Sequence, residues 1–248
     1  MSKALLVTGA SRGIGRACAL LAARHGWSVG VNYRLDAEAA DAVVREIATG
    51  GGRAVALKGD VASEADIVAM FEQATNALGP LTGVVANAGI VAPSARLADM
   101  SAERMRRIFE VNVLGAYLTA REAARRMSES SGGAGGSIVL MSSAAARLGS
   151  PNLYVDYAGS KGAIDTLTLG LSKELGPEGV RVNALRPGLI ETEIHASGGE
   201  PDRARTLGRS SPLGRPGTAQ EIAEAAVWLL SDAASYVTGA ILDVTGGR

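Results

Sequence analysis

Residues 5–26 read LLVTGASRGIGRACALLAARHG, an apolar run followed by three glycines and then by a helical pattern. Gly9, Gly13 and Gly15 stand between the expected first strand and first helix, where the backbone turns sharply and can approach a ligand closely. The free N–H groups and the positive dipole end of that helix would then face a phosphate. The spacing Gly-x-x-x-Gly-x-Gly therefore predicts a dinucleotide site, with an ordinary tight turn as the alternative.

The alternation of strand and helix continues along the chain. After a first strand at 4–8, further strand-like runs lie at 28–33, 54–60, 83–87, 137–143, 180–188 and 240–246. Amphipathic stretches separate them, which implies right-handed crossovers and parallel strands. We therefore predict a single-domain α/β Rossmann fold over residues 1–248, with a doubly wound, seven-stranded parallel sheet and helices on both faces.

One segment interrupts this alternation. Residues 189–217 are rich in Gly, Pro and Ser and contain the run HASGGEPDRARTLGRSSPLGRPG. A long irregular segment inside a compact fold is usually functional. We expect residues 189–217 to form a substrate loop or lid.

The composition narrows the function classes. The 248 residues carry 25 Lys and Arg against 25 Asp and Glu, a formal net charge of zero that does not predict a nucleic-acid surface. Hydrophobic residues make up 47%, as in soluble proteins with a large core. Cys18 is the only cysteine, which fits a reducing compartment. With neither a leader nor an apolar run of membrane-spanning length, we expect a cytoplasmic protein that binds neither membrane nor nucleic acid.

The end of the second expected strand indicates which nucleotide is bound. An NAD site normally places an acidic side chain there for the ribose 2′-hydroxyl, whereas arginine suits a 2′-phosphate. Here the strand ends with Tyr33 and Arg34, and Arg12 in the glycine loop adds a second cation. Asp36 could be a displaced ribose ligand, but we favour it as the cap of the following helix. The sequence thus predicts NADP(H), with NAD(H) as the alternative.

A second motif lies in residues 155–162, VDYAGSKG, where Tyr157 precedes Lys161 by four residues and both fall on one helix face. Seven motifs follow the order seen in the short-chain dehydrogenase/reductase family: TGASRGIG (8–15), GDV (59–61), ANAG (86–89), VNV (111–113), SS (142–143), YAGSK (157–161) and RPGLIET (186–192). The resemblance covers essentially the entire chain. Within the family, the chain is similar to bacterial 3-oxoacyl-carrier-protein reductases and glucose 1-dehydrogenases.

The resemblance implies reversible hydride transfer between a nicotinamide and a small carbonyl or secondary alcohol substrate. It makes Tyr157 the proton donor and acceptor, and a phenol with an ordinary pKa of about 10 is a poor base at neutral pH. Lys161 would lower that pKa, as would the charge of the oxidised nicotinamide, and would also hold the nicotinamide ribose. Ser143 would hydrogen-bond the carbonyl oxygen as charge builds on it, and Asn112 would hold a water that links Lys161 to solvent.

Two neighbouring residues fit these roles less well. Ser142 would lengthen the gap to Tyr157, which at 14 residues from Ser143 already exceeds that of many relatives by one. Tyr154 lacks a lysine four residues on, where Ala158 stands.

The resemblance also implies the cofactor contacts. The adenine would lie along Asp60 and Val61, and the nicotinamide beside the segment 187–192. The expected cofactor-binding residues are Gly9, Ser11, Arg12, Gly13, Ile14, Gly15, Tyr33, Arg34, Asp60, Val61, Asn87, Ala88, Gly89, Tyr157, Lys161, Pro187, Gly188, Ile190 and Thr192. No His, Cys and carboxylate group has metal-ligand spacing, so we expect no metal.

Other functions remain open at this stage. A 3-oxoacyl-carrier-protein reductase needs basic residues for its acidic partner, and the segments before the fifth and sixth strands, GGAGGS and GPEGV, contain none. Enoyl reduction normally goes with a longer Tyr-to-Lys spacing. A dinucleotide-binding regulator without turnover would not need Tyr157, Lys161 and Ser143 together.

The resemblance further implies a homotetramer. The helices near 101–127 and 155–175 would form apolar faces, with Ala158, Gly159, Gly162 and Ala163 allowing close packing. The substrate pocket is expected around residues 90–97, 144–154 and 195–199, with His195 in a pocket or surface role.

Overall fold

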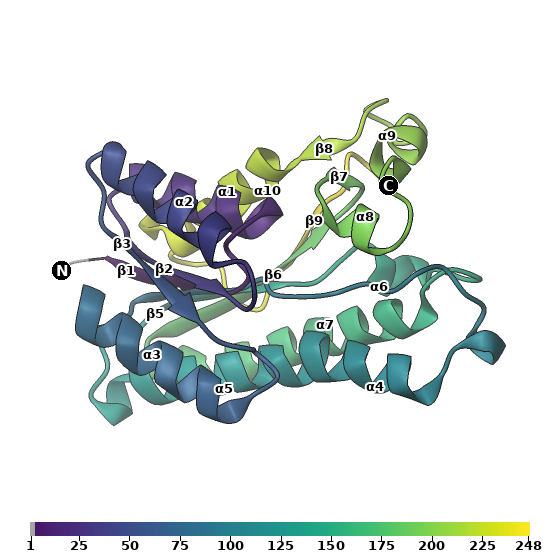
Figure 1. Ribbon diagram of the computed structural model, residues 1–248. Coiled ribbons are helices and arrows are strands. Elements are labelled where there is room, and N and C mark those ends of the chain that lie inside the picture. The colour runs from purple at the N-terminus through teal and green to yellow at the C-terminus, as the bar shows by residue number, and fades with distance from the viewer. Residues whose placement is uncertain (1–2) are drawn as a thin grey trace.

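The computed structural model describes residues 3–248 and has a parallel sheet at its centre (Figure 1). Seven strands run in the order β3-β2-β1-β4-β5-β6-β9, and each neighbouring pair is parallel. They are β1 (Ala4–Val7), β2 (Ser28–Tyr33), β3 (Ala54–Lys58), β4 (Gly83–Ala86), β5 (Gly136–Met141), β6 (Val180–Pro187) and β9 (Ile241–Val244). The predicted α/β fold class and doubly wound sheet are confirmed.

Most strands end one or two residues earlier than predicted. Asp60, Asn87 and Ser143 were expected inside strands, but each lies just beyond the carboxyl end of one. The residues that leave the ladder at this edge are therefore those available to a ligand, because ligands of open α/β sheets bind outside the carboxyl ends of the strands.

Helices cover both faces of the sheet (Figure 1). The helices α1 (Gly13–Arg24), α2 (Ala37–Thr49) and α10 (Ala219–Leu230) lie over one face, and α3 (Glu64–Leu78), α5 (Gly115–Met127) and α7 (Val155–Leu175) over the other. Each face has its own apolar core, with Cys18 and Trp27 in the first and Phe71 and Ile164 in the second. Burial raises the pKa of the Cys18 thiol to about 12, so this side chain is a core residue.

The segment 189–217 is more regular than a loop. It contains β7 (Ile190–Glu191), α8 (Ile194–Ser197), α9 (Arg203–Gly208) and β8 (Gly217–Thr218), and β7 pairs with β8 in a short parallel ladder. In Figure 1 these elements stand together above the carboxyl edge of the sheet. Short turns of 3-10 helix lie at Leu97–Asp99, Glu129–Ser131, Gly176–Glu178 and Asp232–Ala234, and α4 (Ala102–Phe109) and α6 (Ala145–Leu148) complete the helices.

Side chains cap several helices, but not α1. Asp36 caps α2 by accepting a hydrogen bond from the Ala39 N–H at 2.9 Å, which confirms its predicted capping role. Thr218 and Glu221 form a reciprocal capping box on α10. Helix α1 begins after Arg12 without a side-chain cap and has no acidic residue in its first turn. Its N-terminal N–H groups are thus left available to an anion.

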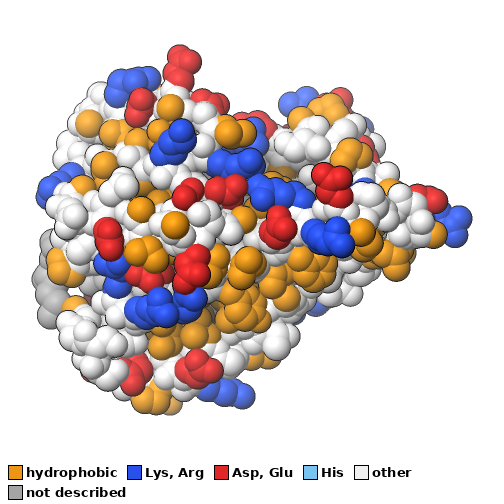
Figure 2. All heavy atoms as spheres, turned by 60° about the horizontal axis from the view of Figure 1, so that its bottom comes forward, with side chains coloured by type: hydrophobic (Ala, Val, Ile, Leu, Met, Phe, Trp, Pro, Cys, Tyr) orange, Lys and Arg blue, Asp and Glu red, His pale blue; other side chains and the backbone are white. Residues whose placement is uncertain are grey.

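The outer face of α4, α5 and α7 carries exposed apolar side chains. Figure 2 shows hydrophobic groups gathered on this side of the molecule. The large exposed ones are Phe109 on α4, Tyr117 on α5 and Leu169 on α7, together with Leu114 in the turn between α4 and α5. The predicted small residues divide between two sides of α7: Gly159 is exposed, but Ala158 is only 5% exposed and packs inward. Ala158 therefore does not belong to the outer face. Across residues 3–248, none of the helices combines the length and apolar character needed to cross a membrane.

Candidate active site

A groove crosses the carboxyl edge of the sheet where the strand order reverses between β1 and β4. We call it the glycine-loop groove. Of the residues predicted to bind cofactor, thirteen line it: Gly9, Ser11, Arg12, Gly13, Ile14, Tyr33, Arg34, Asp60, Val61, Asn87, Ala88, Gly89 and Thr192. Segments from β1, β2, β3, β4 and the predicted lid therefore meet in one extended depression, as a dinucleotide requires.

The three glycines of the loop have different roles. Gly9 and Gly13 have φ angles of +62° and +55°, a region that favours glycine. Gly15 does not line the groove: a Cβ there would collide with the Gly9 carbonyl and lie 2.6 Å from Asn87 Nδ2. This glycine allows α1 to pack against the loop, and its predicted contact with the cofactor stays a prediction. Asn87, which follows β4, donates from its Nδ2 to the Gly9 carbonyl at 3.1 Å and so also binds the glycine loop.

A buried amide that the sequence analysis did not identify holds the loop from the other side. Asn32, in β2, is 2% exposed, and its Oδ1 accepts from the Gly9 N–H at 3.0 Å. Its Nδ2 donates to the carbonyls of Leu57 and Gly59, both at 3.1 Å. The one available signal was a polar residue inside the apolar run SVGVNY. Asn32 fixes the glycine loop relative to the ends of β2 and β3.

Charged side chains gather where the groove passes the carboxyl ends of β2 and β3. Asp60 Oδ2 lies 3.0 Å from Arg34 Nε and 3.3 Å from Arg107 Nη2. Partial burial would raise the pKa of Asp60, but the Ala62 N–H and the two arginines outweigh it, so that pKa is lowered. Arg107, from α4, was not predicted, because it is distant in sequence from the glycine loop. Arg12 also lines the groove, so the two predicted cations do lie in one site.

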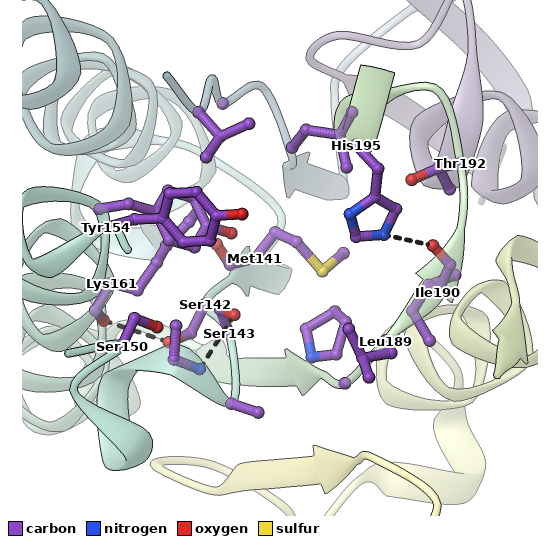
Figure 3. A pocket seen from close by; sticks show the side chains of 18 of the residues that line it. Met141, Ser142, Ser143, Ser150, Tyr154, Lys161, Leu189, Ile190, Thr192 and His195 are labelled. Atoms are coloured by element: carbon purple, nitrogen blue, oxygen red, sulfur yellow. Dashed lines mark hydrogen bonds between the residues drawn. The ribbon is translucent and has the colours of Figure 1, made fainter. Parts of the chain in front are cut away.

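The groove continues into a second depression, which we call the Tyr157 cavity. Ile14, Asn87, Gly89 and Thr192 line both. The cavity also brings together the predicted residues Ser143, Tyr157, Lys161, Pro187, Gly188 and Ile190. In Figure 3, Ser143 and Lys161 lie on one side, His195, Thr192 and Ile190 on the other, and Met141 between them. Val91, Ala144, Tyr154 and His195 from the expected substrate segments line it too.

Tyr157 and Lys161 occupy successive turns of α7, with Lys161 Nζ 5.6 Å from the centre of the Tyr157 ring. Burial raises the pKa of Tyr157, with the Ser143 hydroxyl acting in the opposite direction as a hydrogen-bond partner. Burial also lowers the pKa of Lys161 to about 8, against the raising effect of Asp165. For the protein by itself, burial of the phenol therefore sets the net direction of the Tyr157 pKa, and the lowering effect predicted for Lys161 and the oxidised nicotinamide stays a prediction.

Lys161 is held by the backbone of the neighbouring strand. Its Nζ donates to the Met141 carbonyl at 2.7 Å, and the residue is 4% exposed. A buried ammonium needs such partners, since burying it unpaired is costly. Asp165, one turn further along α7, accepts from Arg186 Nη2 at 2.8 Å and adds a negative charge beneath the lysine. The lysine is thereby fixed with its charge directed toward the cavity wall.

The two serines after β5 are separated in function by their environment. Ser142 is 2% exposed and donates to Asp165 Oδ1 at 2.6 Å, which fits its predicted exclusion from the chemistry. The Ser143 Oγ accepts a hydrogen bond from the Ala145 N–H at 3.1 Å. The Ser143 side chain is also a hydrogen-bond partner of the Tyr157 hydroxyl. Ser143 is therefore the serine placed beside the phenol.

Asn112 lies behind the cavity and does not line either depression. It sits in a π-helical turn, Glu110–Leu114, between α4 and α5. Its side chain accepts from the Ile90 N–H at 2.8 Å and donates to the Ile90 carbonyl at 2.9 Å. A Cβ on Gly89 would be 3.3 Å from Asn112 Oδ1 and 3.4 Å from Lys161 Nζ, so these groups close around Gly89. Asn112 clamps the segment after β4, and its predicted water relay stays a prediction.

The elements of segment 189–217 form one wall of the cavity. His195 Nε2 lies 2.9 Å from the Ile190 carbonyl, and desolvation lowers the pKa of His195. Arg203, from α9, lines the cavity as well and was not identified from the sequence. Within residues 3–248, no cluster of three or more His, Cys, Asp or Glu side chains could hold a metal ion.

Comparison with known proteins gives consistent matches over the full length. The family model described as "Enoyl-(Acyl carrier protein) reductase" matches residues 9–248. The chain is 52% identical to "Uncharacterized oxidoreductase YgfF" of Escherichia coli (strain K12), over 98% of each chain. It is 36% identical to "Glucose 1-dehydrogenase 2" of Bacillus subtilis (strain 168), over 99% of this chain and 94% of the relative. A solved short chain dehydrogenase from Burkholderia cenocepacia J2315, in complex with NADP, is 32% identical with a TM-score of 0.90, covering 100% of this chain and 98% of that one.

Proposed function

The chain belongs to the short-chain dehydrogenase/reductase family of oxidoreductases, and from that premise we propose that it transfers hydride reversibly between NADP(H) and a small carbonyl or secondary alcohol substrate. One observation carries the proposal: Ser143, Tyr157 and Lys161 line a cavity that opens into the glycine-loop groove. The bound nicotinamide would supply or accept the hydride. The residues of the chain supply the proton and the positioning.

The groove fits a dinucleotide in its backbone and its charge. The uncapped N-terminus of α1 and the left-handed turn at Gly13 leave N–H groups for a pyrophosphate. Arg12 and Arg34 line the same groove, and their guanidinium groups would bind a 2′-phosphate. The NADP bound to the Burkholderia cenocepacia relative adds support for this cofactor.

Tyr157 acts as the general acid in the reducing direction. Its raised pKa keeps the phenol protonated at neutral pH, ready to donate to the oxygen that gains charge as the carbonyl is reduced. The Ser143 hydroxyl beside it hydrogen-bonds the same oxygen. Lys161, with a pKa of about 8, stays mostly cationic at pH 7 and stabilises the phenolate as it forms.

Replacing Tyr157 by Phe tests this mechanism. We expect kcat/KM for carbonyl reduction to fall by about 10²- to 10⁴-fold, the usual contribution of a positioned acid, while the Kd for NADPH stays unchanged. Tyr117, which is 42% exposed on α5, provides the matched control, and Tyr117→Phe should keep full activity. Undiminished turnover in Tyr157→Phe would refute the mechanism and the enzyme proposal with it.

A carrier-protein thioester is the second candidate substrate, favoured by the description of the matching family model. The absence of arginine from GGAGGS and GPEGV argues less strongly against it than the sequence suggested. These segments precede β5 and β6 at their amino ends, whereas Ser143 follows the carboxyl end of β5. NADPH oxidation with 3-oxoacyl and enoyl thioesters, measured beside free ketones, sugars and quinones, distinguishes the candidates.

We further propose that residues 1–248 act as one dinucleotide-binding and catalytic domain in a cytoplasmic homotetramer, with 189–217 as its substrate lid. The exposed Phe109, Leu114, Tyr117 and Leu169 supply an apolar face suited to a second copy. The exposed Gly159 and Gly170 on α7 leave room for a close helix approach. Light scattering that gives a monomer mass independent of concentration would refute the assembly.

A further inference from the structure

The charged groups of the Tyr157 cavity have one sign. Lys161, His195, Arg203 and Arg248 line it, and none of the described residues that line it is Asp or Glu. Lys161 is bound to the Met141 carbonyl. The pKa of His195 is lowered by burial and by Arg203, which favours the neutral imidazole. The proposed proton chemistry uses neither Arg203 nor Arg248, and of these two cations Arg248 is exposed whereas the Arg203 side chain is only 12% exposed.

Arg203 is held rigidly in that wall. Its side chain is only 12% exposed, and its Nη1 donates to Glu200 Oε2 at 2.8 Å. The guanidinium stacks over the Tyr154 ring, 5.0 Å from its centre. Glu200 is itself fixed, because its Oε1 accepts from Ser94 Oγ at 2.5 Å and from the Tyr154 hydroxyl at 3.2 Å. Glu200 and Tyr154 contact Arg203 directly, and Ser94 holds Glu200 in place.

This arrangement leaves donors for a ligand. An arginine carries five N–H donors, and among the described residues only Nη1 of Arg203 has a hydrogen-bond partner. Glu200 lies behind Arg203 and does not line the cavity. The pair with Glu200 avoids the cost of an isolated buried charge, while the remaining N–H groups keep the geometry that matches a carboxylate.

The rest of the cavity wall favours an apolar substrate body. Met141 lines the cavity, and so do Leu189, Ile190 and Ile194 of the lid segment. A polyhydroxylated sugar would lose water there without gaining partners for most of its hydroxyls. A substrate with an apolar body and one acidic group would pack against the apolar wall and bind the arginine.

We propose that the substrate of this site is a ketone, or the matching secondary alcohol, with a carboxylate on an apolar body, and that Arg203 binds the carboxylate. This inference rests on the proposed reductase function and adds its substrate class. Arg203 is then a specificity-determining residue. An uncharged amide of the same shape turns an NH₂ group toward the arginine donors, so it binds less well.

Matched pairs of ketones test the inference. Steady-state rates of NADPH oxidation by the full chain are compared for 4-oxopentanoate, 4-oxocyclohexanecarboxylate and 4-acetylbenzoate, each beside its primary amide. We expect kcat/KM to favour the carboxylate by about ten- to a hundredfold in at least one pair, as hydrogen bonds to a charged partner are the stronger ones. Equal rates within every pair, or faster reduction of the amides, overturn the inference.

Variants of α9 connect the preference to Arg203. In Arg203→Met the carboxylate preference should disappear through a higher KM for the carboxylates, whereas Arg203→Lys should keep part of it. Arg205→Met is the control, because Arg205 is 76% exposed on the same helix and does not line the cavity. An unchanged Kd for NADPH shows that Arg203→Met is folded. A preference that survives in Arg203→Met overturns the assignment.

The two proposals fail in different ways. If the wild-type chain reduces no carbonyl compound at all with NADPH, the proposed function itself is wrong and the inference falls with it. If neutral ketones are reduced but the carboxylates show no higher kcat/KM than their amides, the reductase function stands and only the substrate class is overturned.

Discussion

Lys161 gives the protein a stability that rises with pH. Its pKa falls from the ordinary lysine value of 10.5 to about 8 in the folded chain because burial disfavours the ammonium. Between these two values the unfolded chain binds more protons than the folded one, so the free energy of unfolding increases with pH in that window. At about 1.4 kcal/mol per pKa unit, the gain from pH 8 to pH 10.5 is on the order of 3 kcal/mol.

Urea unfolding of the protein without cofactor measures this gain. Trp27 and Trp228 report the transition by fluorescence at pH values of about 7.5, 9 and 10.5, which span the window. Other groups titrate in the same range, so the quantity of interest is the difference in pH slope between the wild type and Lys161→Met. We expect the variant to lack the rise of about 3 kcal/mol that burial of the lysine produces.

A matched control separates this effect from general lysine titration. Lys173 lies exposed near the end of the same helix, and Lys173→Met should keep the wild-type slope because its ammonium stays in water. Parallel pH slopes in the wild type and Lys161→Met would show that the lysine keeps its ordinary pKa when folded. The conclusion that burial disfavours the Lys161 ammonium would then be wrong.

Three further predictions concern single positions. Asp156→Asn should lower the free energy of unfolding in urea by about 3–5 kcal/mol, because the Asp156 side chain is 1% exposed and pairs with Arg104 at 2.8 Å. Glu46→Gln breaks an exposed ion pair and should lower it by at most about 1 kcal/mol. Equal losses of stability in the two variants would contradict the argument. Gly15→Ala should weaken NADPH binding in a fluorescence titration, because the added Cβ collides with the glycine loop; an unchanged Kd would show that the loop adjusts. Arg34→Asp should reduce the NADP-to-NAD ratio of kcat/KM by about tenfold or more, and a retained ratio would remove Arg34 from the 2′-phosphate site.

The sheet and the Tyr157–Lys161 pair followed from local patterns in the sequence. Alternating apolar runs and amphipathic stretches predict the order of elements, since side-chain periodicity belongs to each element alone. The four-residue spacing of Tyr157 and Lys161 puts both on one face of any helix that contains them. Asp36 was identified as a cap for the same reason, since a capping side chain reaches only the next few residues.

The parts that were wrong or missing depend on distant contacts. Arg107 and Arg203 come from helices far from the motifs they join, and no spacing rule connects them to the groove or the cavity. The burial that raises the Tyr157 pKa in the protein by itself was missing from the prediction, because the sequence shows a nearby lysine but not the extent of burial. The sequence places Gly15 in the glycine loop but does not show that its lack of a Cβ lets α1 approach the Gly9 carbonyl.

The sequence by itself determined which elements form, their order, and which side chains share a face, because covalent neighbours and helix or strand periods set those properties. The tertiary structure alone decided which charges are buried, which arginines reach the two depressions, and the protonation of Tyr157 and Lys161. These quantities depend on how far water is excluded and on distances between segments far apart in the chain, which only the packed structure fixes.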